Sequence, residues 1–407
     1  MEDVRRNASR IIGALTLQRI GDSVVDAKTV LPWLFTALGT PTGLIGLLVP
    51  IRESLSLLPQ ASLLPRVRRV RLRKLAWVFG AGGQAGSVAV MALVAATLDG
   101  TAAGVLILLA LAAFALFRAL GSIASKDVLG RTVPKGRRGR VTGVATTIGG
   151  AVAIAMGLAI RVLGGGQVQV GPLAWLLLGA AATWVVGAVL FATVSEPREP
   201  AAEIGADSWL RHSVQLLRED KPFRRFVLVR TLLLVSALSP PFVVSLASDV
   251  SGATLGALGP FVLASGVASL VSGWLWGGVA DRSSRRAMML GAGGASGVLL
   301  ALLALLPTDV IAGTTWPYVG AYLLLMLAHT GARVGRKTYV VDLAEGNQRT
   351  DYVAVSNTAM GVLLLGAGGL SAALAQIGVG VALGFLAVLG LVGVLLATRL
   401  PEVSARA

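Results

Sequence analysis

The feature that most constrains this chain is a series of apolar runs, each long enough to cross the hydrocarbon core of a bilayer as a helix. Only 14% of the 407 residues are charged, whereas soluble domains carry about 25%. We therefore expect an all-α membrane protein with twelve transmembrane helices. The expected segments are 11–38, 42–64, 75–97, 102–124, 141–163, 171–194, 226–248, 255–279, 287–306, 316–334, 352–375 and 378–398.

Positive charge is divided unevenly between the two sets of loops. The net charge is +16, yet nearly all lysines and arginines lie at the chain ends and in the loops after even-numbered segments, and the opposite loops hold only Arg161. Because basic loops stay in the cytoplasm, the asymmetry predicts a multi-pass protein of the cell (inner) membrane with both termini cytoplasmic. The basic charge is thus a topology signal. We expect a monomer whose partner is the lipid bilayer, with no nucleic acid.

The longest polar stretch divides the chain in the middle. It covers residues 196–225 and is typical of a cytoplasmic linker, in which Asp207 can cap a short amphipathic helix. Residues 1–195 and 226–407 lie on either side, and each contains six of the apolar segments. We expect each part to form a six-helix bundle.

The two parts also resemble each other where their fourth segments end. Gly121 corresponds to Gly331 and Gly136 to Gly346, at a constant offset of 210 residues. Two six-helix halves in parallel orientation are a known plan for transporters, with the substrate site where the halves meet. The sequence therefore predicts two pseudo-symmetric bundles around a central site.

A charged motif, GGVADRSSRR at residues 277–286, lies between the eighth and ninth segments. It resembles the signature G-x-L-a-D-R-x-G-R-R of the Major Facilitator Superfamily. Arg118 with Gly121, and the later run PKGRRGR, are similar to the helix-four arginine motif of that family and its following loop. The family's antiporter glycine–proline motif has no counterpart, since TTIGGAVAIAMG in the fifth segment contains no proline. The resemblance implies the fold of this family and secondary transport by alternating access.

The charges of this motif are candidates for a cytoplasmic gate. Asp281, at the end of the eighth segment, is followed by Arg282, Arg285 and Arg286. By resemblance, charge-assisted hydrogen bonds among these groups hold the outward-facing state and separate when the inside opens. The alternative is that the arginines are only positive-inside anchors, a role that does not need the aspartate.

Charged residues inside the segments are costly at the bilayer centre and need partners or water. Asp22 and Asp26 share one face of the first segment, since they are four residues apart. At a rise of about 1.5 Å per residue, Asp22 lies at the depth of Arg118 in the fourth segment, and Asp26 lies at the depth of Arg52 in the second. We therefore expect the pairs Asp22 with Arg118 and Asp26 with Arg52.

These pairs have two interpretations. A carboxylate that exchanges an arginine partner for a proton can couple transport to a proton gradient, and we favour Asp22 because Arg118 belongs to the family-like motif. The alternative is a permanent ion-pair network that orients the helices. Glu53, next to Arg52, lies at a similar depth or faces the linker side of its helix.

Two further features lie in the second half. His329 is the sole intramembrane histidine; it suits a proton site, or it merely hydrogen-bonds a neighbour. Pro240 and Pro241 remove two backbone donors from the seventh segment and should break it. By resemblance to the family this break is a hinge for the outer gate, and the alternative is a passive kink.

Enzyme motifs are missing from the sequence. It has no HExxH, no P-loop and no nucleophilic triad, so we expect no enzyme, no cofactor and no metal site. Without cysteine, disulfides and cysteine-ligated clusters are excluded as well. We expect a proton-coupled secondary transporter of a small organic molecule, with export favoured and antiport as the coupling mode. The alternatives are an importer or facilitator of a small metabolite, or a lipid transporter or scramblase on the same fold.

Overall fold

The computed structural model of the protein describes residues 2–134, 138–163, 170–197, 209–252, 254–308, 313–343 and 349–403, and all regular elements in these ranges are helices. The first half contains α1 (Glu2–Val24), α2 (Val30–Ala37), α3 (Thr42–Leu57), α4 (Gln60–Arg69), α5 (Arg73–Thr97), α6 (Gly100–Thr132), α7 (Arg138–Leu163) and α8 (Val170–Ala192). The second contains α9 (Trp209–Glu219), α10 (Lys221–Leu232), α11 (Val235–Leu238), α12 (Pro240–Val250), α13 (Leu255–Arg282), α14 (Ser284–Leu305), α15 (Trp316–Leu343), α16 (Arg349–Ile377) and α17 (Val379–Ala397).

Eight helical stretches in the described residues are long and apolar enough to cross a bilayer. They are α5, α6, α7, α8, α10–α12, α14, α16 and α17. The other four expected segments correspond to α1–α2, α3–α4, α13 and α15. Phe79, Leu109, Trp175 and Ile377 point outward and are 62–77% exposed, as suits side chains that face lipid. The all-α membrane architecture expected from the sequence is confirmed.

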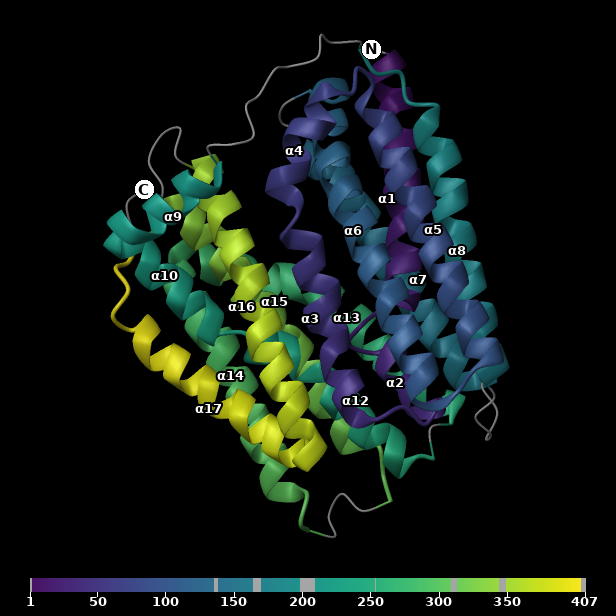
Figure 1. Ribbon diagram of the computed structural model, residues 1–407, viewed down its shortest axis with the longest axis vertical. Helices are drawn as coiled ribbons and strands as arrows, with labels where there is room; N and C mark the ends of the chain where they lie inside the picture. The colour runs from purple at the N-terminus through teal and green to yellow at the C-terminus, as the bar shows by residue number, and fades with distance from the viewer. Residues whose placement is uncertain are drawn as a thin grey trace.

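The helices form two groups, α1–α8 on one side and α10–α17 on the other (Figure 1). The most extensive contacts between the groups are those of α3 with α16 and of α7 with α13. In the second pair, a Cβ added at Gly157 would lie 2.6 Å from the backbone nitrogen of Leu263, and one at Gly259 would lie 2.6 Å from that of Arg161. Both positions therefore need glycine for the backbones to approach this closely.

One end of the molecule is closed by a further contact between the groups. Helices α2 and α12 lie at this end and pack on each other, whereas α4 and α9 lie toward the opposite end (Figure 1). Trp33 of α2 is fully buried, and its ring centroid lies 5.9 Å from that of Phe261 on α13. We call this the α2/α12 end.

The first expected segment, 11–38, is not one helix. α1 ends at Val24 and α2 begins at Val30, so the prediction of a continuous span is wrong. The cause is Asp26, whose carboxylate accepts hydrogen bonds from the backbone N–H of Lys28 at 2.9 Å and the hydroxyl of Thr29 at 2.8 Å. Such side-chain bonds compete with the helical ladder.

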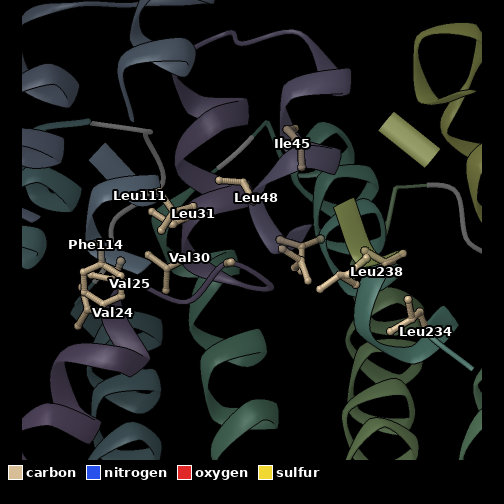
Figure 2. Close-up of a cluster of buried hydrophobic side chains, with 14 of the residues drawn as sticks. Val24, Val25, Val30, Leu31, Ile45, Leu48, Leu111, Phe114, Leu234 and Leu238 are labelled. Carbon is tan, nitrogen blue, oxygen red and sulfur yellow. The ribbon is translucent and has the colours of Figure 1, made fainter. Parts of the chain in front are cut away.

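Apolar packing surrounds this break. Val24, Val25, Val30 and Leu31 flank it, and Figure 2 shows them beside Leu111 and Phe114 of α6. All six side chains are buried, at 5% exposure or less. The irregular backbone between α1 and α2 is thus enclosed by protein, which is where a membrane protein tolerates it.

Two more segments differ from their expected form. The segment 42–64 is divided at Pro59, which has no N–H to continue α3. The seventh segment begins at Lys221 instead of 226, because Asp220 caps α10 by accepting a hydrogen bond from the backbone N–H of Phe223 at 2.9 Å. In the linker, α9 is present where a short helix was expected, but Asp207 lies outside the described residues.

The proline pair lies at a break, as expected. Pro240 and Pro241 occupy the first turn of α12, where a missing N–H costs nothing, and the short α11 separates them from α10. The offset of 210 residues that relates the two halves carries the α1–α2 break at 25–29 onto 235–239, which contains α11. The first segment of each half is therefore broken at an equivalent place.

Candidate functional site

A cavity of about 340 Å³ lies between the two groups of helices. Its wall is formed by α1, α3, α6 and α7 of the first half and by α13 and α15 of the second. The charged and titratable side chains on this wall are Arg19, Asp22, Asp26, Lys28, Arg52, Glu53, Arg118, His329 and Arg333. All six of the residues expected to form a proton site lie here.

Asp22 lies at the centre of an acid–base network. Its Oδ1 accepts a hydrogen bond from Nη1 of Arg118 on α6 and lies 3.4 Å from Nη2 of Arg52 on α3. Asp26 contributes Oδ2, which lies 3.5 Å from Nη1 of Arg52. The structure thus brings together both expected pairs. It also joins them, because Arg52 contacts both carboxylates.

Arg52 has an aromatic neighbour as well. Its guanidinium carbon lies 5.8 Å from the ring centroid of Phe114 on α6, within the range of a cation–π contact. Glu53, the next residue along α3, lines the same cavity and does not face away from it. Helix α3 therefore presents both of its charged residues to the space between the halves.

The break between α1 and α2 places Lys28 against the second half. Nζ of Lys28 lies 2.9 Å from Nε2 of His329 on α15, and Lys28 is only 7% exposed. An ammonium group can only donate, so Nε2 is the acceptor and the ring proton of a neutral histidine sits on Nδ1. Nδ1 lies 3.3 Å from the hydroxyl of Ser236 on α11. The two broken segments are thus linked through one imidazole.

A second bond crosses the halves at the same place. The hydroxyl of Thr29 lies 2.5 Å from the phenol oxygen of Tyr322 on α15, and both residues are buried. Sequence reasoning did not single out Lys28, Thr29 or Tyr322 as site residues. The available signal was a lysine inside an apolar segment, which needs a partner at that depth.

The expected cytoplasmic gate is described only in part. The side chain of Asp281 lies outside what the structure describes, and Arg282 and Arg286 are exposed. Arg285 donates to the backbone carbonyl of Leu400 at 2.7 Å, and its Nε lies 3.6 Å from Glu402. Arg285 therefore ties α14 to the segment after α17, within its own half.

The corresponding place in the first half contains a different cluster. Arg73, at the start of α5, is buried, and its Nε lies 3.0 Å from Asp127 on α6. Nε of Arg131 contacts the other oxygen of Asp127 at 3.0 Å. Glu196 accepts from the backbone N–H groups of Arg73 and Lys74. The sequence analysis missed this cluster, although Asp127 and Arg131 are one helical turn apart.

Solved transporter structures share the arrangement of these helices over nearly their whole length. The xylose transporter XylE from E. coli, in an inward open conformation, matches with a TM-score of 0.71 at 11% identity, over 98% of this chain and 97% of its own. A POT family transporter in complex with 5-aminolevulinic acid gives 0.72 at 12% identity, over 96% and 95%. A bacterial homologue of the iron transporter ferroportin, in an inward-facing state, gives 0.67 at 18% identity, over 97% and 99%. This is the major facilitator fold.

Comparison of the sequence with curated proteins gives a match to part of the chain. No family model matches the chain. A probable membrane-anchored ferredoxin of Chromohalobacter salexigens is 39% identical over 132 residues, which are 32% of this chain. The match spans 17% of the length of that relative. Since the 407 residues include no cysteine, the shared stretch brings no cysteine ligand for an iron–sulfur cluster.

Proposed function

We propose that this protein is a proton-coupled secondary transporter of a small organic molecule that works by alternating access. The observation that carries the proposal is the position of Asp22, whose carboxylate is shared by Arg118 and Arg52 on the wall of a cavity between the halves. Ionisable groups at this depth in a membrane protein mark transport and proton pathways. The transporters that share the fold, a xylose transporter and a POT family transporter among them, support the same conclusion.

A proton on Asp22 would change which helices hold together. The carboxylate of α1 contacts guanidinium groups of α3 and α6, and protonation would remove the charge that both groups share. The contacts of α1 with α3 and α6 would weaken together, and release of the proton would restore them. Proton binding is thereby coupled to the packing of the broken first segment.

The moving units are the six-helix bundles of residues 1–195 and 226–407, joined by the linker 196–225. The α2/α12 end is closed by Lys28 with His329 and by packing of α2 on α12. Arg19 and Arg333 also line the cavity and are exposed, so we infer that it opens toward the opposite end. That end carries the basic loops, and we assign it to the cytoplasm of the cell membrane, with both termini there.

In this scheme a single chain is the working unit, and export by antiport with protons is the proposed direction. Pro240 and Pro241, at the start of α12, would act as the hinge where the outer gate opens. The gate role of Asp281, Arg282, Arg285 and Arg286 is part of the same proposal.

The test uses the purified full-length chain in proteoliposomes that contain a pH-sensitive dye. A panel of sugars, nucleosides, amino acids, small organic acids and amines is supplied with and without an imposed pH gradient. We expect at least one solute to move protons and to be concentrated against its own gradient, with a protonophore abolishing accumulation. Equilibration of a solute without proton movement would instead identify a facilitator. Movement of labelled lipid without solute transport would identify a scramblase.

A further inference from the structure

The cavity between the halves has an excess of positive charge. Five basic side chains and three carboxylates line it, so basic groups exceed acidic groups by two. The basic groups are Arg19, Lys28, Arg52, Arg118 and Arg333, and the acidic groups are Asp22, Asp26 and Glu53. Walls of low dielectric constant strengthen the field of such an excess inside a cleft.

Two of the three carboxylates already have basic partners. Asp22 contacts Arg118 and Arg52, and Asp26 contacts Arg52. These pairs use two acids and two arginines, so they contribute no net charge. The excess therefore lies with the three basic groups outside the pairs, since Glu53 is the one carboxylate of the described cavity lining that the pairs do not use.

Three basic groups remain, and they come from both halves. Arg19 lies on α1 and Arg333 on α15; both are exposed, and neither makes a hydrogen bond or ion pair within the described part of the chain. Lys28 is buried, and the partner of its ammonium group is the imidazole of His329. Position 149 of α7 is a glycine where it meets Arg19, and a Cβ added there would lie 2.6 Å from the Cβ of Arg19.

A second observation points the same way. Two arginines of the second half that do not line the cavity are buried: Arg230 of α10 is 7% exposed and Arg336 of α15 is 4% exposed. Arg230 donates to the hydroxyl of Ser356 at 2.7 Å and to the side-chain oxygen of Asn357 at 2.9 Å. Both guanidinium groups also contact the sulfur of Met360.

These two buried arginines thus have neutral side-chain partners in the described residues. An uncompensated buried cation is costly, and an anion bound nearby would offset part of that cost. His329, Arg333 and Arg336 are spaced by four and three residues, so they share a face of α15. Arg333 and His329 line the cavity, and Arg336 adds positive charge one helical turn further along α15.

We infer that the cavity binds a small organic anion, whose carboxylate or phosphate oxygens are held between Arg19 of the first half and Arg333 of the second. The inference rests on the proposed function, since it names the substrate class of the same cavity. A guanidinium group binds either oxyanion through two parallel N–H donors. An anion that contacts one arginine from each half would bind tightly when the halves close around it and would dissociate when they separate.

Binding without any gradient tests this inference separately from transport. The thermal unfolding temperature of the purified full chain is measured at constant ionic strength with succinate, benzoate, inorganic phosphate and glycerol 3-phosphate. Succinamide and 1,4-diaminobutane serve as neutral and cationic analogues. We expect saturable stabilisation by carboxylates, by phosphates or by both, and none by the analogues. Comparison of the two carboxylates with the two phosphates shows which oxyanion the cavity binds.

The variants Arg19→Gln and Arg333→Gln connect the effect to the cavity. Loss of one charge-assisted hydrogen bond should weaken anion binding about tenfold or more in each variant. Arg225→Gln is the matched control, because Arg225 is an exposed arginine of α10 that does not line the cavity, and it should bind as the wild type does. Neither Arg19 nor Arg333 makes a hydrogen bond or ion pair to another side chain in the described residues, so both variants should fold.

Three outcomes would overturn the inference: no saturable effect of any anion, equal stabilisation by a neutral or cationic analogue, or unchanged anion binding in both variants. Failure of the proposed function is a different result. Anion binding without proton-driven accumulation would leave the substrate class standing and remove the coupling. Proton-driven transport of a neutral or cationic solute alone would support the coupling and remove the anionic substrate class.

Discussion

The ammonium nitrogen of Lys28 lies 2.9 Å from Nε2 of His329, and this bond joins the two halves of the molecule. Lys28 reaches that position because Asp26 accepts its backbone N–H and thereby shapes the break between α1 and α2. The same Asp26 contacts Arg52 in the acid–base network of the first half. A change in the charge of the carboxylates can therefore affect the closed α2/α12 end through Asp26, which contacts both Arg52 and the backbone of Lys28.

The first prediction concerns this bond. Lys28→Met and His329→Leu should each destabilise the closed α2/α12 end, because a hydrogen bond to a charged group contributes about 1.5–3 kcal/mol. That corresponds to a shift of about tenfold or more in the ratio of open to closed forms. The chain has no cysteine, so spin labels on cysteines introduced at the exposed positions Leu98 and Val250 can report the distance across this end.

His329→Gln is the control for that experiment. Glutamine keeps a side-chain acceptor for Lys28, so its distance distribution should stay closer to that of the wild type. Distances that are unchanged in Lys28→Met and His329→Leu would show that packing of α2 on α12 closes this end without the bond.

Sequence reasoning placed the acid–base pairs because helix geometry fixes depth. The depths of Asp22, Arg52 and Arg118 follow from a constant rise per residue along their helices, and the structure brings these side chains together with Asp26. The expectation that Asp22 and Asp26 share one helix face is wrong, because Asp26 lies within the break at 25–29, and its contact with Arg52 therefore depends on the break.

The break itself could not be read from hydropathy. It arises from hydrogen bonds of one aspartate to the backbone and hydroxyl that follow it, and an apolar run looks the same with or without them. The Lys28–His329 bond could not be predicted from the sequence for a related reason. Its partners are 301 residues apart, and they meet only because the break turns Lys28 toward the other half.

The second prediction concerns the contact between α7 and α13. Gly157→Ala should push these helices apart, because the new Cβ would lie 2.6 Å from the backbone nitrogen of Leu263. Overpacking of this kind costs about 1–3 kcal/mol, so the thermal unfolding temperature and the transport rate should both fall. Gly82→Ala on α5 is the matched control, since nothing lies within 4 Å of its added Cβ. Equal behaviour of the two variants would contradict a close contact between the halves here.

The third prediction concerns the cytoplasmic gate. Asp281, in the last turn of α13, should restrain the cytoplasmic side, so Asp281→Asn should increase the inward-facing fraction and lower turnover while expression stays normal. Labels at the exposed positions Lys126 on α6 and Lys337 on α15 would measure the change. A wild-type distance distribution with wild-type transport would leave Arg282 and its neighbours as positive-inside anchors only.

The last prediction concerns the carboxylates of the first segment. Asp22 holds both Arg118 and Arg52, whereas Asp26 holds Arg52 and the backbone of the break. If Asp22 carries the coupling proton, Asp22→Asn should abolish pH-driven accumulation yet retain counterflow, in which substrate exchanges without net proton movement. Asp26→Asn should reduce both activities, because an amide cannot hold Arg52 as an ion pair and it weakens the turn that positions Lys28. Asp99→Asn, at an exposed cap of α6, is the control and should retain both activities. Accumulation that persists in both Asp22→Asn and Asp26→Asn would assign these residues to a structural network. If instead both variants unfold, as their thermal unfolding temperatures would show, the pairs hold the first bundle together and the proton site must be sought at Glu53 or His329.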